Sequence, residues 1–335
     1  MRSAIVGCGA IAQVHADCMK EIKNCEIVAF ADCKLERAEG MASRYGGKAY
    51  SSLEEIINQE KIEVLHICTP HYLHVPMAIQ ALTRDIHVFC EKPPVISYEQ
   101  YKALKEISID KQLGFCFQNR YNPSIVRVKE MLAAGEAGKI LGARGMLTWM
   151  RDRRYYEESD WRGRLAKEGG GVLINQSIHT MDLLQYLIDE PPVSIHAVTT
   201  NHHLQGVIEE EDTISALIQY ANAKAIFYAS SAYTSNPDPL IELDCENMRI
   251  RVEGVQVVIY LPDGRVINPQ IQRREGYGKN YWGAGHLNCI SDYYSSIESH
   301  QPCPLNLREV DATIQLMLGA YESAQTGKVI EIGIK

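Results

Sequence analysis

The opening of the chain holds the feature that most constrains its fold, a glycine-rich turn with the spacing G-x-G-x-x-A directly after the apolar run Ala4-Ile5-Val6. The first glycine permits a tight turn, the second lets the backbone approach a pyrophosphate, and the alanine permits close packing of a helix on the strand. The N-terminus of that helix also offers free N–H groups and a partial positive charge. The pattern predicts a dinucleotide site formed by Gly7, Gly9, Ala10, Ile11 and Ala12.

Asp32 ends the second predicted strand, about 20 residues past this turn. A carboxylate there accepts hydrogen bonds from the adenosine ribose hydroxyls and repels a 2′-phosphate, which favours NAD over NADP. Lys34 and Arg37 follow closely in the sequence and keep NADP as the alternative. A second interpretation is that Asp32 only caps the next helix.

Up to about residue 120, apolar strands alternate with helical stretches, as in parallel β-α-β units. The predicted strands are Ser3–Val6, Glu26–Ala31, Val64–Cys68, His87–Cys90 and Leu113–Phe117. The predicted helices are Ala12–Ile22, Leu35–Tyr45, Ser52–Gln59, His74–Thr83 and Tyr98–Ser108. The first half therefore predicts an α/β fold with a doubly wound parallel sheet of the Rossmann type.

The second half changes to longer alternating strands, which are typical of a mostly antiparallel sheet. A first helix at 125–133 is followed by predicted strands at Gly142–Met150, Ser194–Asn201, Thr213–Tyr220, Ala225–Ser231, Leu240–Cys245 and Val255–Tyr260. The run Gly169-Gly170-Gly171 precedes a helix from about Val172 to Leu187, and a late helix spans about 307–326. No linker is long enough to separate independent modules.

Composition narrows the classes of function. The 335 residues are 46% hydrophobic with a net charge of −8, and without a basic block this argues against nucleic acid or an anionic membrane as a partner. No apolar run is long enough to cross a bilayer, and the chain starts in a strand instead of a signal-peptide core, so we expect a cytoplasmic protein with a small-molecule substrate. The ten cysteines form no C-x-x-C pair, and His202-His203 with Glu209-Glu210-Glu211 lack ligand spacing, so we expect no metal.

Lys92 is the first candidate for chemistry. It follows the predicted strand His87–Cys90 and lies in Glu91-Lys92-Pro93. Ligands of open α/β sheets bind beyond the carboxyl ends of the strands, so a lysine at such an end is placed to exchange a proton with a substrate hydroxyl. The alternative is a surface lysine before a turn.

A second constellation lies in the predicted helix after the glycine run. Helix positions four and seven apart share a face, so Asn175, His179 and Asp182 are expected to line up and bind a polyol, with His179 relaying a proton. The alternative is a satisfied structural pair. Upstream, an arginine- and aromatic-rich segment with Tyr155, Trp161 and Arg162 favours an acidic or phosphorylated sugar, although a solvated surface loop explains it equally well.

Together these motifs resemble the Gfo/Idh/MocA oxidoreductases, named for glucose-fructose oxidoreductase and inositol dehydrogenase. The resemblance also rests on Cys68-Thr69-Pro70 with His74, on Tyr281-Trp282-Gly283 with His286, and on the closing segment from Tyr321 to Lys328. It implies a Rossmann domain at 1–121, a substrate-binding and oligomerisation α/β domain with a large open sheet at 122–304, a helix at about 305–326 that packs back on the first domain, and a last strand at 328–335. It also implies a homodimer or homotetramer.

The resemblance implies that Lys92 and His179 are catalytic and that NAD(P) moves a hydride to or from a sugar or cyclitol hydroxyl. Besides the turn and Asp32, the cofactor residues that it implies are Cys68, Thr69, Pro70, His74, Glu91, Lys92, Gln118 and Asn119. The implied substrate-binding residues are Asn175, Asp182, Tyr155, Trp161, Arg162 and His286.

One departure concerns Asn175, because inositol dehydrogenase-like members carry an aspartate four residues before the histidine. An amide cannot take a proton, which shifts acid-base duty to Lys92 and His179, a pattern similar to members that act on nucleotide-linked sugar acids. Two further hypotheses stay open: a redox-neutral glycosidase in which tightly held NAD oxidises the sugar transiently, and a non-catalytic regulator that senses NAD.

Overall fold

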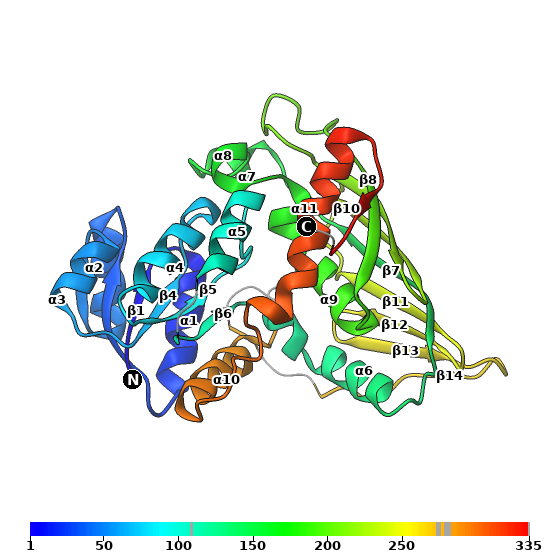
Figure 1. Ribbon diagram of the computed structural model, residues 1–335, viewed down its shortest axis with the longest axis horizontal. Coiled ribbons are helices and arrows are strands. Elements are labelled where there is room, and N and C mark those ends of the chain that lie inside the picture. Colours follow the sequence, from blue (N-terminus) through cyan, green and yellow to red (C-terminus); the bar gives the residue numbers. More distant parts are fainter. Residues whose placement is uncertain (108–109, 273–275, 278–282, 334–335) are drawn as a thin grey trace. The chain divides into compact units, whose positions relative to one another are not determined.

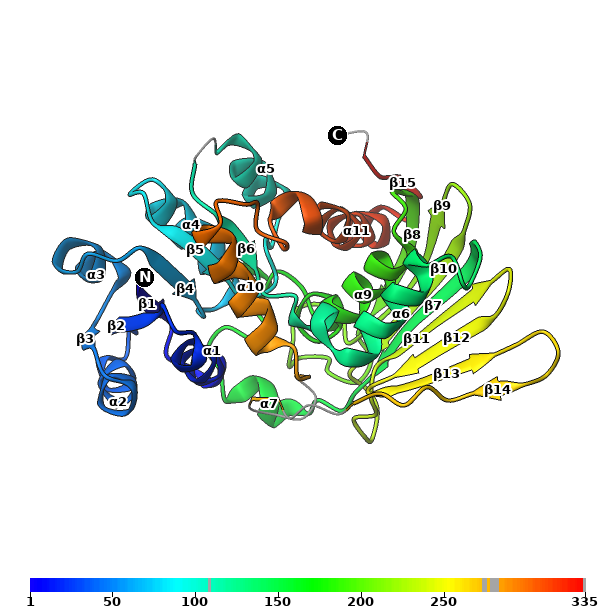
Figure 2. The same ribbon diagram turned by 90° about the horizontal axis from the view of Figure 1, so that it is seen from below.

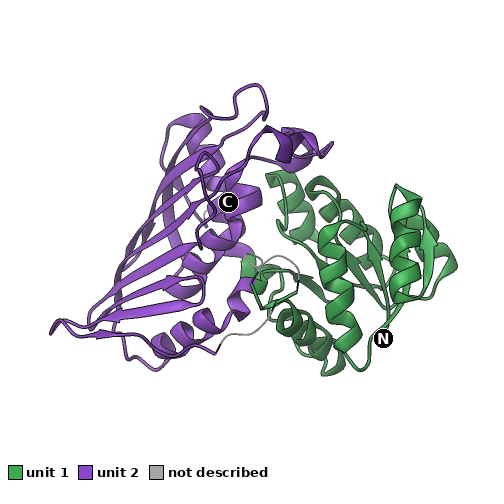
Figure 3. Ribbon diagram, turned by 180° about the vertical axis from the view of Figure 1, so that it is seen from behind, with its two compact units in different colours: residues 1–118, 275–310 green, residues 119–274, 311–335 purple. Residues whose placement is uncertain are grey.

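The computed structural model describes residues 1–107, 110–272, 276–277 and 283–333, and the chain divides into two compact units (Figure 3). The first unit consists of residues 1–118 and 275–310, and the second of residues 119–274 and 311–335. This division differs from the expected one because helix α10 (His286–Glu298) belongs to the first unit, and α11 (Leu307–Thr326) belongs to the second from Asp311 onward. Packing of α11 on the first domain stays a prediction.

The first unit is built on a sheet of six parallel strands in the order β3-β2-β1-β4-β5-β6 (Figure 1). The strands are β1 (Arg2–Val6), β2 (Glu26–Ala31), β3 (Lys48–Tyr50), β4 (Val64–Ile67), β5 (His87–Cys90) and β6 (Leu113–Phe115). Their residues are buried almost without interruption, as expected for strands covered on both faces. The strand order reverses between β1 and β4, and the carboxyl ends of these strands mark the place where such sheets bind ligands.

Six helices belong to this unit among its described residues. They are α1 (Ala10–Glu21), α2 (Leu35–Tyr45), α3 (Leu53–Gln59), α4 (His74–Leu82), α5 (Tyr98–Glu106) and α10. Ser52 and Ser97 begin α3 and α5, and the hydroxyl oxygen of each accepts a hydrogen bond from a backbone N–H three residues on, at 3.2 and 3.3 Å. α1 packs against α10, and α4 packs against α5.

The second unit is built on a nine-stranded sheet in the order β14-β13-β12-β11-β7-β10-β9-β8-β15. The strands are β7 (Ile140–Thr148), β8 (Pro192–Thr200), β9 (Thr213–Tyr220), β10 (Lys224–Ser230), β11 (Leu240–Cys245), β12 (Arg249–Glu253), β13 (Gln256–Tyr260), β14 (Val266–Ile267) and β15 (Ile330–Glu331). All neighbours are antiparallel except β7 and β10. The expected large, mostly antiparallel sheet is confirmed.

Helices α6 (Pro123–Ala133), α9 (Ile178–Ile188) and α11 lie over one face of this sheet (Figure 2). The opposite face carries no helix of the unit in the part of the chain that the structure describes. The strands alternate accordingly: in β9, Ile214 and Ile218 are fully buried, whereas Leu217 is 48% exposed. No helix formed by the described residues is long and apolar enough to cross a membrane.

Candidate functional site

The predicted dinucleotide turn has the geometry that its glycines require. Gly7 follows β1 with a φ of +86°, and its N–H donates to the Ala31 carbonyl at 2.8 Å. A Cβ at this position would lie 2.6 Å from the carbonyl group of Cys68, so the turn and the end of β4 approach too closely for any side chain. The turn therefore lies where the strand order reverses.

The rest of the turn leaves room for a ligand at the start of α1. A Cβ on Gly9 would meet nothing within 4 Å, Ala10 is exposed, and Ile11 is half-buried. Ala12 is fully buried, as expected for the residue that brings the helix close to the strand. Gly9 is the N-cap of α1, so the first N–H groups of that helix lie beside this open space and suit a pyrophosphate.

Asp32 lies directly after β2 and joins two turns. Its Oδ2 accepts a hydrogen bond from the Cys8 N–H at 2.8 Å, and its Oδ1 accepts one from the Lys34 N–H at 2.9 Å. Lys34 is the N-cap of α2, so Asp32 does bond at the start of the next helix, and its expected contact with the adenosine ribose stays a prediction. The carboxylate supports the next helix and also fixes the backbone of the glycine turn.

The loop after β4 is joined to the loop after β5 by His74. Its ring nitrogens lie 2.9 Å from the carbonyl oxygens of Thr69 and Pro93, and the residue is 1% exposed. Burial lowers the pKa of His74, although the two carbonyl contacts act in the opposite direction. His74 therefore positions the half-buried Thr69 and Pro70 and the segment after Lys92, and its expected contact with the cofactor stays a prediction.

Lys92 is half-buried and lies two residues beyond the end of β5, at the same edge of the sheet as the glycine turn. Its N–H donates to Oε2 of Glu91 at 3.3 Å, and the Lys92–Pro93 peptide bond is cis. Glu91 is 7% exposed and positions Lys92, and its expected contact with the cofactor stays a prediction.

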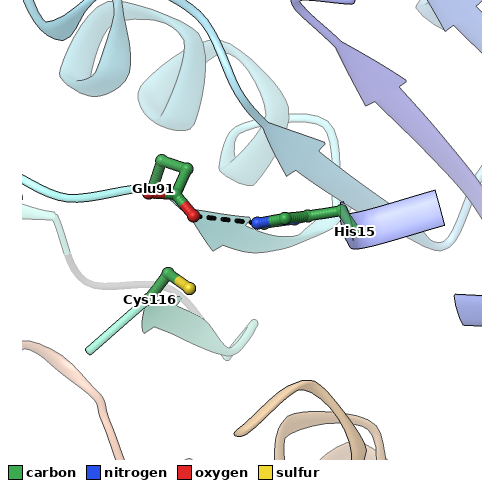
Figure 4. Close-up of side chains that lie close together, drawn as sticks. All are labelled: His15, Glu91 and Cys116. Carbon is green, nitrogen blue, oxygen red and sulfur yellow. Dashed lines mark hydrogen bonds and ion pairs between the residues drawn. The ribbon is translucent and has the colours of Figure 1, made fainter. Parts of the chain in front are cut away.

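Two buried imidazoles, His15 and His66, form a hydrogen-bonded chain that holds Glu91. Oε1 of Glu91 lies 2.9 Å from Nε2 of His15 (Figure 4). Nδ1 of His15 lies 2.9 Å from Nδ1 of His66, and Nε2 of His66 lies 3.1 Å from the Tyr294 hydroxyl. Burial alone would raise the pKa of Glu91, but the hydrogen bond and charge of His15 lower it on balance. Burial lowers the pKa of His66, which favours its neutral form.

Cys116 lies beside this chain (Figure 4), and its sulfur with His15 and Glu91 forms a group of possible metal ligands whose atoms lie within 4.8 Å of one another. His15 and Glu91 already bond to each other, and burial raises the pKa of the Cys116 thiol well above its usual range. A metal would need the thiolate, so we interpret the group as a hydrogen-bonded network. The expected absence of a metal stays a prediction.

Two other predicted residues of the first unit are buried. His286 is the first residue of α10 and is 1% exposed, and burial lowers its pKa to about 4 while the charge of Glu91 opposes this shift. His286 is thus electrostatically coupled to the Glu91 network, and its expected role in substrate binding stays a prediction. Gln118 is 4% exposed and its Oε1 lies 3.6 Å from the Cys116 sulfur, whereas Asn119 is half-buried. Tyr281 and Trp282 lie outside the described residues.

In the second unit, Glu211 binds the backbone of the glycine run through both its carboxylate and its own carbonyl oxygen. Glu211 accepts hydrogen bonds from three successive N–H groups: Gly171 to Oε2 at 2.9 Å, Val172 to the carbonyl oxygen at 3.1 Å, and Leu173 to Oε1 at 3.0 Å. A Cβ on Gly171 would lie 1.9 Å from the Glu211 carbonyl oxygen. The glycine run exists here because backbone and carboxylate approach this closely.

The run leads into a π-helix, Leu173–Ser177, followed by α9. Between residues 171 and 185, Asn175 and His179 are half-buried and their neighbours are buried. Nδ2 of Asn175 donates a short hydrogen bond to Oε1 of Glu168, which is 1% exposed. This bond fixes the orientation of the Asn175 amide, with its nitrogen toward Glu168, and the expected contact with a substrate hydroxyl stays a prediction.

Asp182 does not share that face. It is 1% exposed, and its oxygens accept two hydrogen bonds from Arg120 at 2.6 and 2.9 Å and one from Thr313 at 2.9 Å. The spacing argument assumed a regular α-helix, and the wider π-turn changes the angle between Asn175 and Asp182. The structure shows Asp182 in a buried ion pair with Arg120, and its expected substrate contact stays untested.

The arginine- and aromatic-rich segment forms a stack. The guanidinium carbon of Arg162 lies 4.5 Å from the ring centre of Tyr155 and 5.4 Å from the ring centre of Trp161. The guanidinium carbon of Arg151 lies 5.0 Å from the ring centre of Tyr155. Gln176 donates to the Tyr155 hydroxyl at 3.3 Å. The three predicted residues Tyr155, Trp161 and Arg162 therefore lie together, next to the element that carries Asn175.

Sequence reasoning missed His15, Glu168 and Glu211. His15 lies three residues after Ala12, about one helical turn beyond the glycine turn. Glu168 directly precedes the glycine run, so both residues lie beside recognised motifs. Glu211 belongs to a run of three glutamates that resembles a solvated connection, and a single sequence gives no signal that the last of them is buried.

Comparison with known proteins gives a consistent result. Residues 1–117 match the family described as "Oxidoreductase family, NAD-binding Rossmann fold". Residues 125–251 match the family described as "GFO/IDH/MocA C-terminal domain".

Individual proteins are similar over different lengths. D-glucoside 3-dehydrogenase of Escherichia coli is 30% identical over 99% of this chain and 97% of its own length. Glucose-6-phosphate 3-dehydrogenase of Bacillus subtilis is 30% identical over 55% of this chain and 53% of its own length. The structure of the WlbA dehydrogenase from Bordetella pertussis, in complex with NADH and UDP-GlcNAcA, has a TM-score of 0.86 and 25% identity, covering 100% of this chain and 99% of that one.

Proposed function

Because the chain belongs to the GFO/IDH/MocA family of NAD-binding oxidoreductases, we propose that it transfers a hydride between NAD and a ring hydroxyl of a sugar, cyclitol or sugar derivative. One observation carries the proposal. Lys92 and the glycine turn lie in the same unit at the same edge of one parallel sheet, beside the point where the strand order reverses.

NAD, when bound, supplies the hydride acceptor. The residues that fit it are the open space over Gly9, the first N–H groups of α1, and Asp32, whose position favours NAD over NADP. Lys92 takes the hydroxyl proton, so that proton and hydride leave the same C–OH group and a ketone remains. Glu91 and His74 hold the backbone on both sides of that lysine.

The second unit contributes the substrate-binding side chains in this proposal. His179 exchanges the proton with solvent, and the Asn175 amide accepts a hydrogen bond from a second hydroxyl. Their half-burial among buried neighbours supports these roles. The named relatives act on a glucoside and a sugar phosphate, and WlbA was solved with a nucleotide-linked sugar acid, which supports a sugar or sugar derivative as the substrate class here.

A homodimer or homotetramer is part of the proposal. The helix-free face of the large sheet carries apolar side chains on adjacent strands: Val198 is 57% exposed, Leu217 48% and Ile226 53%. Leu217 and Ile226 are direct partners in the β9–β10 register, so they form a continuous patch. Burial of such a face against a second copy removes apolar area from water.

A spectrophotometric screen tests the function. Purified protein is incubated with NAD or NADP and a panel of cyclitols, aldoses, sugar acids and nucleotide sugars, and absorbance of the reduced cofactor is followed. Formation of NADH with a subset of the panel supports the proposal. Cleavage of a glycoside by protein that retains NAD through desalting, with no net NADH, would favour the redox-neutral glycosidase, and NAD binding without any turnover would favour the regulator.

A further inference from the structure

Arg162 differs from the nearby arginines Arg154 and Arg164 in its charged partners. Arg154 pairs with Glu158 at 2.8 Å and Arg164 pairs with Glu209 at 3.2 Å. Arg162 has no acidic partner among the described residues, and its Nε is buried without a hydrogen-bond partner there. Its guanidinium therefore holds a positive charge that the described part of the chain does not neutralise.

The guanidinium is nevertheless held in place. It stacks on Tyr155 and Trp161, and Nη1 donates to the Tyr155 carbonyl at 3.4 Å. The Tyr155 side chain packs against the buried apolar cluster of Tyr156, Leu204 and Ile208. Gly163 turns the chain onto that cluster with a φ of +70°, and a Cβ there would lie 2.9 Å from Ile208. A half-buried, pre-oriented guanidinium has lost much of the conformational entropy that binding would otherwise cost.

Glu168 connects this stack to Asn175. The N–H of Gly163, the residue after Arg162, donates a short hydrogen bond to Oε2 of Glu168, and the Asn175 amide donates one to Oε1. One carboxylate thus fixes the backbone next to Arg162 and the amide proposed to bind a substrate hydroxyl. Gln176, the residue after Asn175, also donates to the hydroxyl of Tyr155, the ring on which Arg162 stacks, so two hydrogen-bonded routes join the Asn175 segment to the stack.

A second cation increases the local charge. Arg151 stacks on the same Tyr155 ring, at 5.0 Å from its centre, and donates hydrogen bonds to the Asn236 side chain and the Met150 carbonyl. Two guanidinium groups on one aromatic ring repel each other, and an anion between or beside them relieves that repulsion. The planar N–H groups of arginine match the two oxygens of a carboxylate or phosphate.

We propose that Arg162, stacked on Tyr155 and Trp161 and connected to Asn175 through Glu168, binds an anionic substituent of the substrate. This rests on the proposed function and narrows its substrate class to sugars that carry a carboxylate or a phosphate. Arg162 is then the residue that determines specificity for the charged over the neutral sugar.

Calorimetric titration of the NADH-loaded full chain tests this without requiring turnover. The ligands are glucuronic acid for the carboxylate, glucose 6-phosphate for the phosphate, and glucose as the neutral reference. We expect at least one anionic ligand to bind about tenfold or more tightly than glucose, and the tighter of the two identifies the source of the charge. Equal affinity for all three would overturn the proposal.

Variants assign the effect to the residue. Arg162→Gln should remove the preference for the anion and leave glucose binding within about twofold, and Arg162→Lys should retain part of it because the charge remains but the planar fork is lost. Arg154→Gln removes an exposed arginine of the same segment as a control and should change nothing. A preference that survives in Arg162→Gln, or is lost equally in Arg154→Gln, contradicts the assignment.

The two proposals fail in different ways. NADH formation without a preference for anionic sugars would leave the dehydrogenase intact and remove the role of Arg162. Tight, Arg162-dependent binding of an anionic sugar without any NADH formation would support the anion site and contradict the dehydrogenase.

Discussion

The two compact units support their candidate catalytic side chains with opposite kinds of buried polar group. In the first, imidazoles surround Glu91 beside Lys92, whereas in the second, the carboxylates of Glu168 and Glu211 bind N–H groups around Asn175. The difference follows from the local backbone. Lys92 follows β5, whose backbone groups are paired in the sheet, so its support comes from side chains of neighbouring elements. The glycine run has free N–H groups and no side chains, so it needs acceptors.

Of the substitutions considered, Gly171→Ala should lower the free energy of unfolding most. Gly171→Ala places a Cβ 1.9 Å from the Glu211 carbonyl oxygen, so the run must move away from its acceptor, and we expect a loss of about 4 kcal/mol or more in the free energy of unfolding. Gly9→Ala is the matched control in the first unit, because its Cβ meets nothing within 4 Å. Urea denaturation measures both. Equal stability of the two variants would show that the approach to Glu211 is not required.

The pH dependence of stability should have opposite signs in the two units. Burial lowers the pKa of His286 from 6.5 to about 4, so the unfolded chain binds the proton more readily, and the first unit loses about 3 kcal/mol as the pH falls through this interval. Burial raises the pKa of Glu211 from 4.5 to about 7, so the folded chain binds the proton more readily, and the second unit loses about 3 kcal/mol as the pH rises through that interval.

Amide hydrogen exchange, corrected for the intrinsic rate at each pH, reports the two units separately. His286→Asn should flatten the acid limb for amides of α10, and Glu211→Gln should flatten the opposite limb for amides of α9. The same pH dependence of stability in both units would contradict the expected opposite signs.

Replacement of His15 should affect turnover more than cofactor binding. His15→Gln breaks the chain of imidazoles that holds Glu91, so we expect kcat to fall about tenfold while the Kd for NAD changes less than about twofold. His196→Gln, an exposed histidine of β8, serves as the control. An unchanged kcat in a folded His15→Gln protein would reduce the network to a structural role.

The smallest expected effect concerns the choice of cofactor. Asp32→Asn keeps an acceptor for the Cys8 N–H but removes the charge that repels a 2′-phosphate. The ratio of kcat/KM for NAD over NADP should fall about tenfold, which corresponds to about 1.4 kcal/mol. An unchanged ratio would show that a residue other than Asp32 discriminates between NAD and NADP.

Local patterns predicted the elements of the fold well. The strands at β2, β5, β9 and β11 and the helices α2 and α11 occur with the expected bounds, because their apolar periodicity and end signals agree. The strands β3 and β12 were not predicted: β3 has only three residues, and β12 alternates charged with apolar residues over only five. Helix α10 was missed altogether.

The site was less predictable because its chemistry depends on contacts across the chain. The glycine turn was readable, since its function requires those residues at that spacing. The pairing of Asp182 with Arg120 joins residues 62 apart, and the π-helix that turns Asp182 away from Asn175 has no signature in one sequence. Glu168 and Glu211 are ordinary surface residues by type, and only the fold shows that they are buried.

Turnover of a Lys92→Met variant tests whether Lys92 takes the hydroxyl proton, because the side chain keeps most of its length and loses its amine. With the substrate identified in the screen, we expect NADH formation to fall by about a thousandfold or more while the Kd for NAD, followed by fluorescence, stays within about twofold of the parent value. NADH formation at the parent rate would show that Lys92 does not take part in the chemistry.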